Sequence, residues 1–306
     1  MTGDYERPMV RASMLTSKQQ YPRESSPRQT DQTERPIEVE QITLRTVRRR
    51  PLPQFIIIGA QKAGTTTLYD ALTQHPNVVR AKAKELHYFD NLFRLGLNWY
   101  RSCFPEAGED SITGEASPYY LFHPLAPARC NRSLPGVKIV VLLRNPVDRA
   151  YSHYQHQVRH GHEPLSFEEA IEKENERLYG ETQKLIDDES YHSYAHQHFS
   201  YVSRGNYLDQ LRAWRRHVDA AQMMLLCSER LRQDPATEYS AVLRFLNLPE
   251  WQPSEFPASN SAGYPAMSGA ARGRLGSVFD GQIRELQQYV NAEWPGRSLD
   301  FAHWVD

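Results

Sequence analysis

The chain has 306 residues, of which 40% are hydrophobic and 24% charged, the composition of an ordinary globular protein. Its formal net charge of −1 excludes general attraction to polyanions, so we expect no nucleic-acid partner. The three cysteines, Cys103, Cys130 and Cys227, are scattered without metal-ligand spacing, and no apolar run is long enough to span a membrane. These features predict free thiols, no stable membrane insertion and a cytoplasmic location.

Residues 1–50 are polar, contain several prolines and show no sustained periodicity. Such a segment cannot bury enough apolar surface to offset the entropy lost on ordering. We therefore predict a disordered N-terminal tail over residues 1–50 and one folded domain over residues 51–306. The arginine run 48–50 could touch a membrane or a polyanion, although a solvated linker is the simpler interpretation.

From Phe55 onward, short apolar runs alternate with amphipathic segments. Continuous apolar character predicts buried parallel strands at residues 54–59, 137–146 and 222–231. Helical periodicity and turn residues predict helices at residues 65–76, 147–161, 205–218, 235–249 and 268–296. This alternation predicts an α/β fold in which a P-loop-type parallel sheet carries helices on both faces.

A glycine-rich loop, GAQKAGTTT at residues 59–67, joins the first predicted strand to the first predicted helix. Its glycines allow a tight turn, and its threonines open the helix, where amides and hydroxyls face a bound anion. The ATP-binding form of this loop has a lysine at the position of Thr65, whereas here the lysine is Lys62. The loop therefore predicts an anion site for a ligand other than ATP.

A second motif, LLRNPVDRAYSHYQHQ, follows at residues 142–157. Arg144 directly follows a predicted strand, and Ser152 lies two turns into the next predicted helix. Because α/β sheets bind ligands at the carboxyl ends of their strands, this arginine and serine suit a second phosphate. Arginines often end strands, so the motif is informative mainly together with the first loop.

The order of these motifs resembles the sulfotransferases that use 3′-phosphoadenosine 5′-phosphosulfate (PAPS), above all the heparan-sulfate type of carbohydrate sulfotransferase and its bacterial relatives. The resemblance runs from about Gln54 to Trp304 and includes KELHYFD, GLNWYRSCFP, GEASPYY and SRGNYLDQLRAW. It implies an enzyme that moves a sulfuryl group from PAPS to a hydroxyl or amine. The implied acceptor is a small molecule or carbohydrate: a glycan, a glycolipid or a secondary metabolite.

The resemblance also implies which residues hold the donor. The first loop would hold the 5′-phosphosulfate, and the strand-end arginine with the helix serine would hold the 3′-phosphate. The implied donor-binding residues are Lys62, Ala63, Gly64, Thr65, Thr66, Thr67, Arg144 and Ser152. Lys62 is a catalytic candidate as well, because its ammonium can neutralise charge on the transferring group and the leaving phosphate oxygen.

A base must take the proton of the acceptor hydroxyl, and the resemblance implies Glu85 of RAKAKELHYFD. His87 would lie on the same side of an extended segment, as a competing base, an acceptor ligand or a support for the glutamate. The simpler alternative is a surface ion pair of Glu85 with Lys84 or Lys82.

The sequence departs from the family pattern at two places. Ala116 stands in GEASPYY where many relatives carry a lysine, and the segment 256–274 lacks the bridging cysteine and has its first arginines at Arg272 and Arg274. The last nucleotide contacts are therefore not specified. A non-catalytic nucleotide-binding protein or a kinase-like enzyme is the alternative, although a kinase would need a lysine at Thr65 and an acidic residue where Arg144 stands.

Three histidines near one another in the sequence, His192, His196 and His198, invite a metal site. No acidic or cysteine partner beside them is compelling, and sulfuryl transfer from PAPS needs no metal. We therefore predict no metal and interpret this segment as an acceptor-side lid rich in histidine and tyrosine, able to stack on a sugar or aromatic ring.

Overall fold

The computed structural model describes residues 50–256, 263–296 and 299–304. The predicted tail up to residue 49 lies outside the described residues, so its disorder stays a prediction. Arg50, the last residue of that predicted tail, is already joined to the domain, because its Nη1 donates a hydrogen bond of 2.9 Å to the carbonyl oxygen of Ser102.

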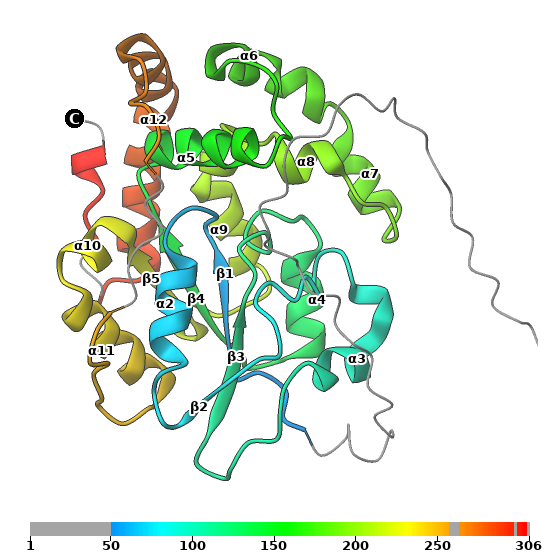
Figure 1. The fold of residues 1–306 in the computed structure, drawn as a ribbon, viewed down its shortest axis with the longest axis vertical. Helices are drawn as coiled ribbons and strands as arrows, with labels where there is room; N and C mark the ends of the chain where they lie inside the picture. The colour runs from blue at the N-terminus through cyan, green and yellow to red at the C-terminus, as the bar shows by residue number, and fades with distance from the viewer. Residues whose placement is uncertain (1–49, 257–262, 297–298, 305–306) are drawn as a thin grey trace, which may run out of the picture. The chain divides into compact units, whose positions relative to one another are not determined.

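A five-stranded sheet lies at the centre of the domain (Figure 1), with the strand order β2-β3-β1-β4-β5. Every neighbouring pair of strands is parallel. The strands are β1 (Phe55–Gly59), β2 (Val78–Arg80), β3 (Ile112–Ala116), β4 (Lys138–Leu143) and β5 (Met223–Cys227). The predicted parallel α/β architecture is confirmed.

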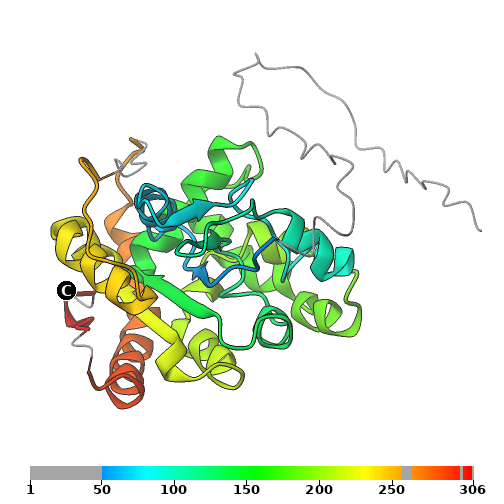
Figure 2. The ribbon, with the colours of Figure 1, turned by 90° about the horizontal axis from the view of Figure 1, so that it is seen from below.

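Helices cover both faces of the sheet (Figures 1 and 2). They are α2 (Thr65–Leu72), α3 (Gly96–Ser102), α4 (Ala126–Ser133), α5 (Pro146–Arg159), α6 (Phe167–Leu178), α7 (Glu181–Asp187), α8 (Tyr194–His198), α9 (Tyr207–Arg215), α10 (Ser228–Gln233), α11 (Pro235–Leu246) and α12 (Gly269–Glu293). Short 3-10 helices are η1 (Phe93–Leu95), η2 (Ser203–Gly205), η3 (Ala220–Gln222) and η4 (Ala302–Trp304). Because α2 and α4 connect strands in opposite directions across the sheet, right-handed crossovers place them on opposite faces.

The strand predictions succeed where strands are apolar throughout. All residues of β1 and β5 are buried, as expected for strands covered on both faces. The third predicted strand is too long, because the chain turns into α10 directly after Cys227. Sequence reasoning missed β2, which has only three residues, and β3, whose sequence ITGEA is not apolar.

Two helix starts position the predicted loop and the strand-end arginine. Gly64 precedes α2 in the left-handed region, with φ 97°. The side chain of Asn145 caps α5 by accepting hydrogen bonds from the amides of Val147 and Asp148. This cap fixes the chain immediately after Arg144, at the carboxyl end of β4.

In Figure 1, α5 runs across the carboxyl ends of the strands, and α6, α7 and α8 lie beside it at the same end of the sheet. We call residues 167–198, which contain these last three helices, the α6–α8 segment; sequence reasoning assigned no helix to it. All three cysteines are buried and free. Among the described residues, none of the helices combines the length and the apolar character that crossing a membrane requires.

Candidate active site

The glycine-rich loop and the strand-end arginine meet at the carboxyl ends of β1 and β4. Arg144 Nη1 donates a hydrogen bond of 2.9 Å to the carbonyl oxygen of Lys62, 82 residues away in the sequence. Lys62 itself has a positive φ of 71°, and a Cβ built on Gly64 would meet nothing within 4 Å. The structure therefore brings the two predicted donor-binding motifs together around a loop whose front is open.

The other predicted donor-binding residues lie in the loop, at the start of α2 and on α5. Ala63 and Thr65 are buried at the base of the loop, and Thr66 and Thr67 continue the first turn of α2. Gly64 offers no side chain to cap that turn, which leaves amides at the helix N-terminus for an anion. Ser152 is buried on α5.

Positive charge is concentrated around Lys62. Burial lowers the pKa of its ammonium, and the charges of Arg159 and Arg144 lower it further, while Glu85 opposes them. Arg144 also has a buried Nε without a hydrogen-bond partner in the described structure. Crowded cations and an unsatisfied buried donor are the surroundings that a multiply charged anion stabilises.

A chain of four charged side chains faces this loop. Lys84 contacts Glu85, His87 Nε2 lies 3.7 Å from Glu85 Oε2, and His87 Nδ1 lies 2.7 Å from Asp90 Oδ2. The predicted extended segment is wrong, because both Glu85 and His87 have positive φ, 58° and 52°. The predicted proximity of the two side chains nevertheless holds, through a turn rather than through strand alternation.

The charges of these four side chains give the two candidate bases, Glu85 and His87, different protonation states. Burial works against a charged His87, but the charge and hydrogen bond of Asp90, with a further contribution from Glu85, raise its pKa to about 10. Partial burial likewise opposes ionisation of Glu85, but its contacts with His87 and Lys84 lower its pKa to about 2. At neutral pH, therefore, Glu85 is an ionised carboxylate able to accept a proton, whereas His87 already carries one.

The buried carboxylate of Glu115, on β3, belongs to a hydrogen-bond network that supports the segment with Glu85 and His87. The hydroxyl groups that donate to Glu115 are those of Tyr100 (2.6 Å), Tyr120 (3.0 Å) and Ser117 (2.7 Å). Tyr120 in turn accepts a hydrogen bond from the amide of Tyr88, and Ala116 accepts one from the amide of Glu85. The side chain of Ala116, where many relatives carry a lysine, is buried.

Sequence reasoning missed Asp90 and Arg204. Asp90, whose side chain is fully buried, closes the KELHYFD motif three residues after His87. Arg204 is buried in the SRGNYLDQLRAW motif; its Nη1 donates to Gln61 in the glycine-rich loop at 2.8 Å, and its Nη2 donates to the carbonyl of Gln197 in α8 at 2.7 Å. The signal in the sequence that could have identified them is that each lies within a motif that carries the family resemblance.

The three histidines considered as metal ligands do not converge. His192 contacts Asn91, His196 lies against Tyr119 and Phe122, and His198 contacts Gln157. Across residues 50–256, 263–296 and 299–304, the one group of histidine, cysteine and acidic side chains with clustered ligand atoms is Cys227, Glu229 and His303. Glu229 there already accepts hydrogen bonds from the amide of Asn145 and the indole of Trp304.

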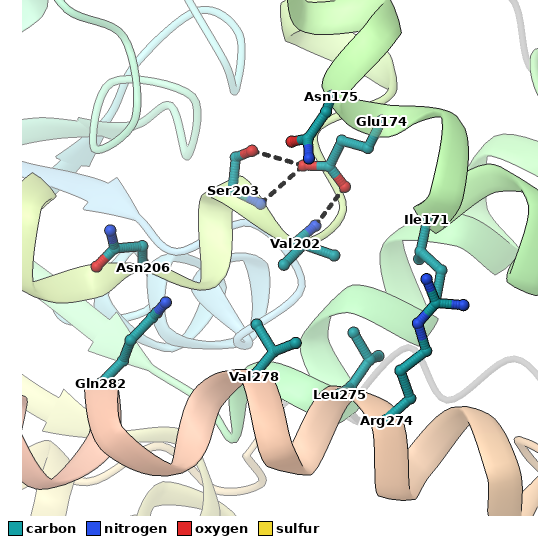
Figure 3. Close-up of a pocket in the computed structure, with 10 residues that line it drawn as sticks. All are labelled: Ile171, Glu174, Asn175, Val202, Ser203, Asn206, Arg274, Leu275, Val278 and Gln282. Atoms are coloured by element: carbon teal, nitrogen blue, oxygen red, sulfur yellow. Dashed lines mark hydrogen bonds between the residues drawn. The ribbon is translucent and has the colours of Figure 1, made fainter.

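A cavity of about 400 Å³ lies elsewhere, between α6, η2 and α12 (Figure 3). Its lining contains none of the predicted site residues. The buried acid in it, Glu174, accepts hydrogen bonds from the amides of Val202 and Ser203 and from the Ser203 hydroxyl. Glu174 thus braces η2, the turn that carries Arg204.

Known proteins similar in sequence to this chain are sulfotransferases. Heparan sulfate glucosamine 3-O-sulfotransferase 3A1 of Mus musculus is 34% identical over 253 residues, which cover 78% of this chain and 60% of that protein. Bifunctional heparan sulfate N-deacetylase/N-sulfotransferase 1 of Caenorhabditis elegans is 32% identical over 209 residues, 66% of this chain and 23% of that protein. The chain thus spans about 60% of the length of the first of these relatives.

A solved structure, the sulfotransferase from Alicyclobacillus acidocaldarius, superimposes with a TM-score of 0.67 at 26% identity, covering 84% of this chain and 100% of the other. The family model described as the sulfotransferase domain matches residues 52–256, which include the glycine-rich loop, Glu85, Arg144 and Arg204. The chain therefore belongs to the sulfotransferase domain family.

Proposed function

We propose that this protein transfers a sulfuryl group from PAPS to a hydroxyl acceptor, or to an amine, with Glu85 as the general base. The observation that carries the proposal is the meeting of Lys62, Arg144 and Glu85 at the carboxyl ends of β1 and β4. Family membership supports PAPS as the donor and a carbohydrate as a plausible acceptor.

The donor's two anionic ends fit the two halves of the site. The 5′-phosphosulfate lies on the amides of the loop and the first turn of α2, beside Lys62, with Ala63, Gly64, Thr65, Thr66 and Thr67 around it. The 3′-phosphate is held by Arg144 and Ser152. Binding satisfies the buried Nε of Arg144 and neutralises the cations that crowd Lys62.

Transfer then needs one bond to form and one to break. The acceptor oxygen forms a bond to the sulfur while the bond from sulfur to the 5′-phosphate oxygen breaks, with the two oxygens roughly in line. The electron pair stays on the phosphate oxygen, which leaves as adenosine 3′,5′-bisphosphate beside Lys62. The hydroxyl proton passes to the carboxylate of Glu85.

The protonation states support Glu85 rather than His87 in this role. His87, with its raised pKa, is a cation held by Asp90, and so it orients the carboxylate instead of taking the proton. The low pKa of Glu85 depends on nearby cations, and the incoming anionic donor opposes them. Donor binding therefore makes Glu85 more basic at the moment when a base is needed.

The experiment has two parts. Calorimetry should show that adenosine 3′,5′-bisphosphate binds far more tightly than ATP, and equal or stronger binding of ATP would mean a kinase-like protein instead. Labelled PAPS supplied with a panel of sugars and small alcohols should then yield a sulfated product identified by mass. Tight bisphosphate binding without any transfer would identify a non-catalytic nucleotide-binding protein.

A further inference from the structure

A row of five rings extends from the reaction centre to the protein surface. We call His156, His160, His162, His198 and Tyr194 the ring row. Ring centroids lie 4.2 Å apart for His156–His160, 6.2 Å for His160–His162, 4.8 Å for His162–His198 and 4.3 Å for His198–Tyr194. The rings come from the end of α5, the turn after it, and α8, so two separate stretches of chain build one continuous row.

The inner end of the row lies beside the proposed chemistry. His156 is on α5 one turn after Ser152, and the charges of both Lys62 and Glu85 act on its imidazole. The outer end, Tyr194, is 52% exposed. An acceptor whose hydroxyl reached Glu85 would therefore meet the ring row with the part of the molecule that does not react.

The row offers flat faces and hydrogen-bonding edges, and at His156 and His198 the charged form of the imidazole is disfavoured. Burial, followed by the charge of Lys62, lowers the pKa of His156 to about 4, and burial followed by His162 does the same for His198. Tyr194 donates to or accepts from His162 Nδ1 at 2.8 Å, and His160 Nδ1 bonds the carbonyl of His156 at 2.8 Å. Within the described residues the Nε2 atoms of His160 and His162 have no partner, so they can bond a ligand's hydroxyl groups.

The segment that carries the outer end of the row, Tyr194 and His198, is acidic. The α6–α8 segment contains nine acidic and three basic residues, a net charge of −6. Asp187, Asp188 and Glu189 are exposed at the end of α7, where Glu189 also pairs with Arg129, and they precede His192, which contacts Asn91 next to Asp90. Negative potential of this kind beside a binding surface repels a polyanion and slows its association.

From these observations we propose that the acceptor is an uncharged sugar, whose non-reacting ring stacks on the ring row, and that the acidic α6–α8 segment rejects sulfated polymers. This inference rests on the proposed function and makes it specific. The curated relatives are named for heparan sulfate, so the inference separates this chain's acceptor from theirs. The exposed cation Arg159 acts on both Lys62 and His156, so it lies where the donor's site meets the inner end of the row.

The test measures binding of sugar probes to the protein saturated with adenosine 3′,5′-bisphosphate. The probes are 4-nitrophenyl β-D-glucoside, the matched glucuronide, which replaces a hydroxymethyl group with a carboxylate, and a heparin tetrasaccharide. We expect the glucoside to bind at least about fivefold more tightly than either anionic probe, a difference of about 1 kcal/mol. Equal or tighter binding of the glucuronide or of heparin overturns the inference, and so does a glucoside that does not bind.

Variants then connect binding to the row. Tyr194→Ala and His160→Ala should each weaken glucoside binding about 2- to 10-fold, the effect of losing one stacked ring. The matched control is Tyr179→Ala, because Tyr179 is 88% exposed at the end of α6 and should leave binding unchanged. Equal losses in the control and the row variants, or no loss in any of them, contradict stacking on the row.

A charge variant tests whether the α6–α8 segment repels sulfated polymers. Combining Asp187→Asn, Asp188→Asn and Glu189→Gln should tighten heparin binding while glucoside binding stays the same, and an unchanged heparin affinity contradicts the repulsion. Failure of the proposed function has a different signature: the bisphosphate itself would not bind. Retained bisphosphate binding together with a preference for anionic sugars would refute only this inference.

Discussion

Replacing Asp90 by asparagine should move the titration of His87 by more than any other single change near the site. Asp90 is fully buried and its Oδ2 lies 2.7 Å from His87 Nδ1, whereas the second carboxylate, Glu85, lies 3.7 Å from Nε2. Together they raise the pKa of His87 from 6.5 to about 10 against the effect of burial. At about 1.4 kcal/mol per unit of pKa, the net preference for the charged imidazole is on the order of 5 kcal/mol.

Asp90→Asn preserves the size of the side chain and removes its charge, so Asp90's share of that preference is lost. We expect the pKa of His87 to fall by about 2 units or more, since Asp90 is its closest anionic partner. The assay is an NMR titration of the His87 imidazole between pH 5 and pH 11. A pKa that stays within half a unit of the wild-type value, or a wild-type pKa near 6.5, would refute the reasoning.

Stability should follow the same titration. Because the folded-state pKa of His87 is raised above its unfolded value, its contribution to folding is fully present below pH 6.5 and is lost as pH rises toward 10. The wild-type melting temperature should therefore fall across this window, and the Asp90→Asn protein should show a smaller fall. The matched control is Asp70→Asn, which breaks an exposed pair with Arg80 and should cost at most about 1 kcal/mol.

The remaining predictions concern turnover and the donor. Glu85→Gln should lower kcat about 10²–10⁴-fold, as loss of a positioned base does, while calorimetry shows unchanged bisphosphate affinity; near-normal turnover would exclude Glu85 as the base. Lys62→Ala should lower kcat and also weaken donor binding, because its ammonium touches the donor before and during transfer; an effect on only one of the two would contradict that placement. Arg144→Ala should weaken bisphosphate binding by about 1.5–3 kcal/mol, and no change in calorimetry would remove it from the 3′-phosphate site.

The sequence predicts β1, β4 and β5 well but misses β2 and β3. β1, β4 and β5 are covered on both faces, so their residues are apolar, apart from Lys138 at the start of β4, and stand out in the sequence. β3 carries Glu115, which is tolerated at 0% exposure only because three hydroxyl groups from distant positions donate to it. No local pattern contains those partners, so a strand with a buried acid cannot be recognised from its own residues.

The same distinction applies to the site. Lys62 and Arg144 could be found from motifs, because each follows a strand and the strands' carboxyl ends meet by topology. The relation of Glu85 to His87 was predicted through the wrong geometry, since left-handed backbone at both residues replaces strand alternation. Arg204 reaches Gln61 across 143 positions, a contact that only the folded chain reveals.

The proposed donor site and the proposed acceptor surface come from different parts of the chain. This separation has a consequence for how the range of acceptors could change in evolution. In the proposed function the donor is held by loops that follow β1 and β4, whereas the ring row and the α6–α8 segment both lie within residues 156–198, from the end of α5 to the end of α8. A single recombination event could exchange that stretch as a cassette and leave the donor half intact. Arg204 marks the downstream junction, because it grips Gln61 and must remain with the donor half for a chimera to function.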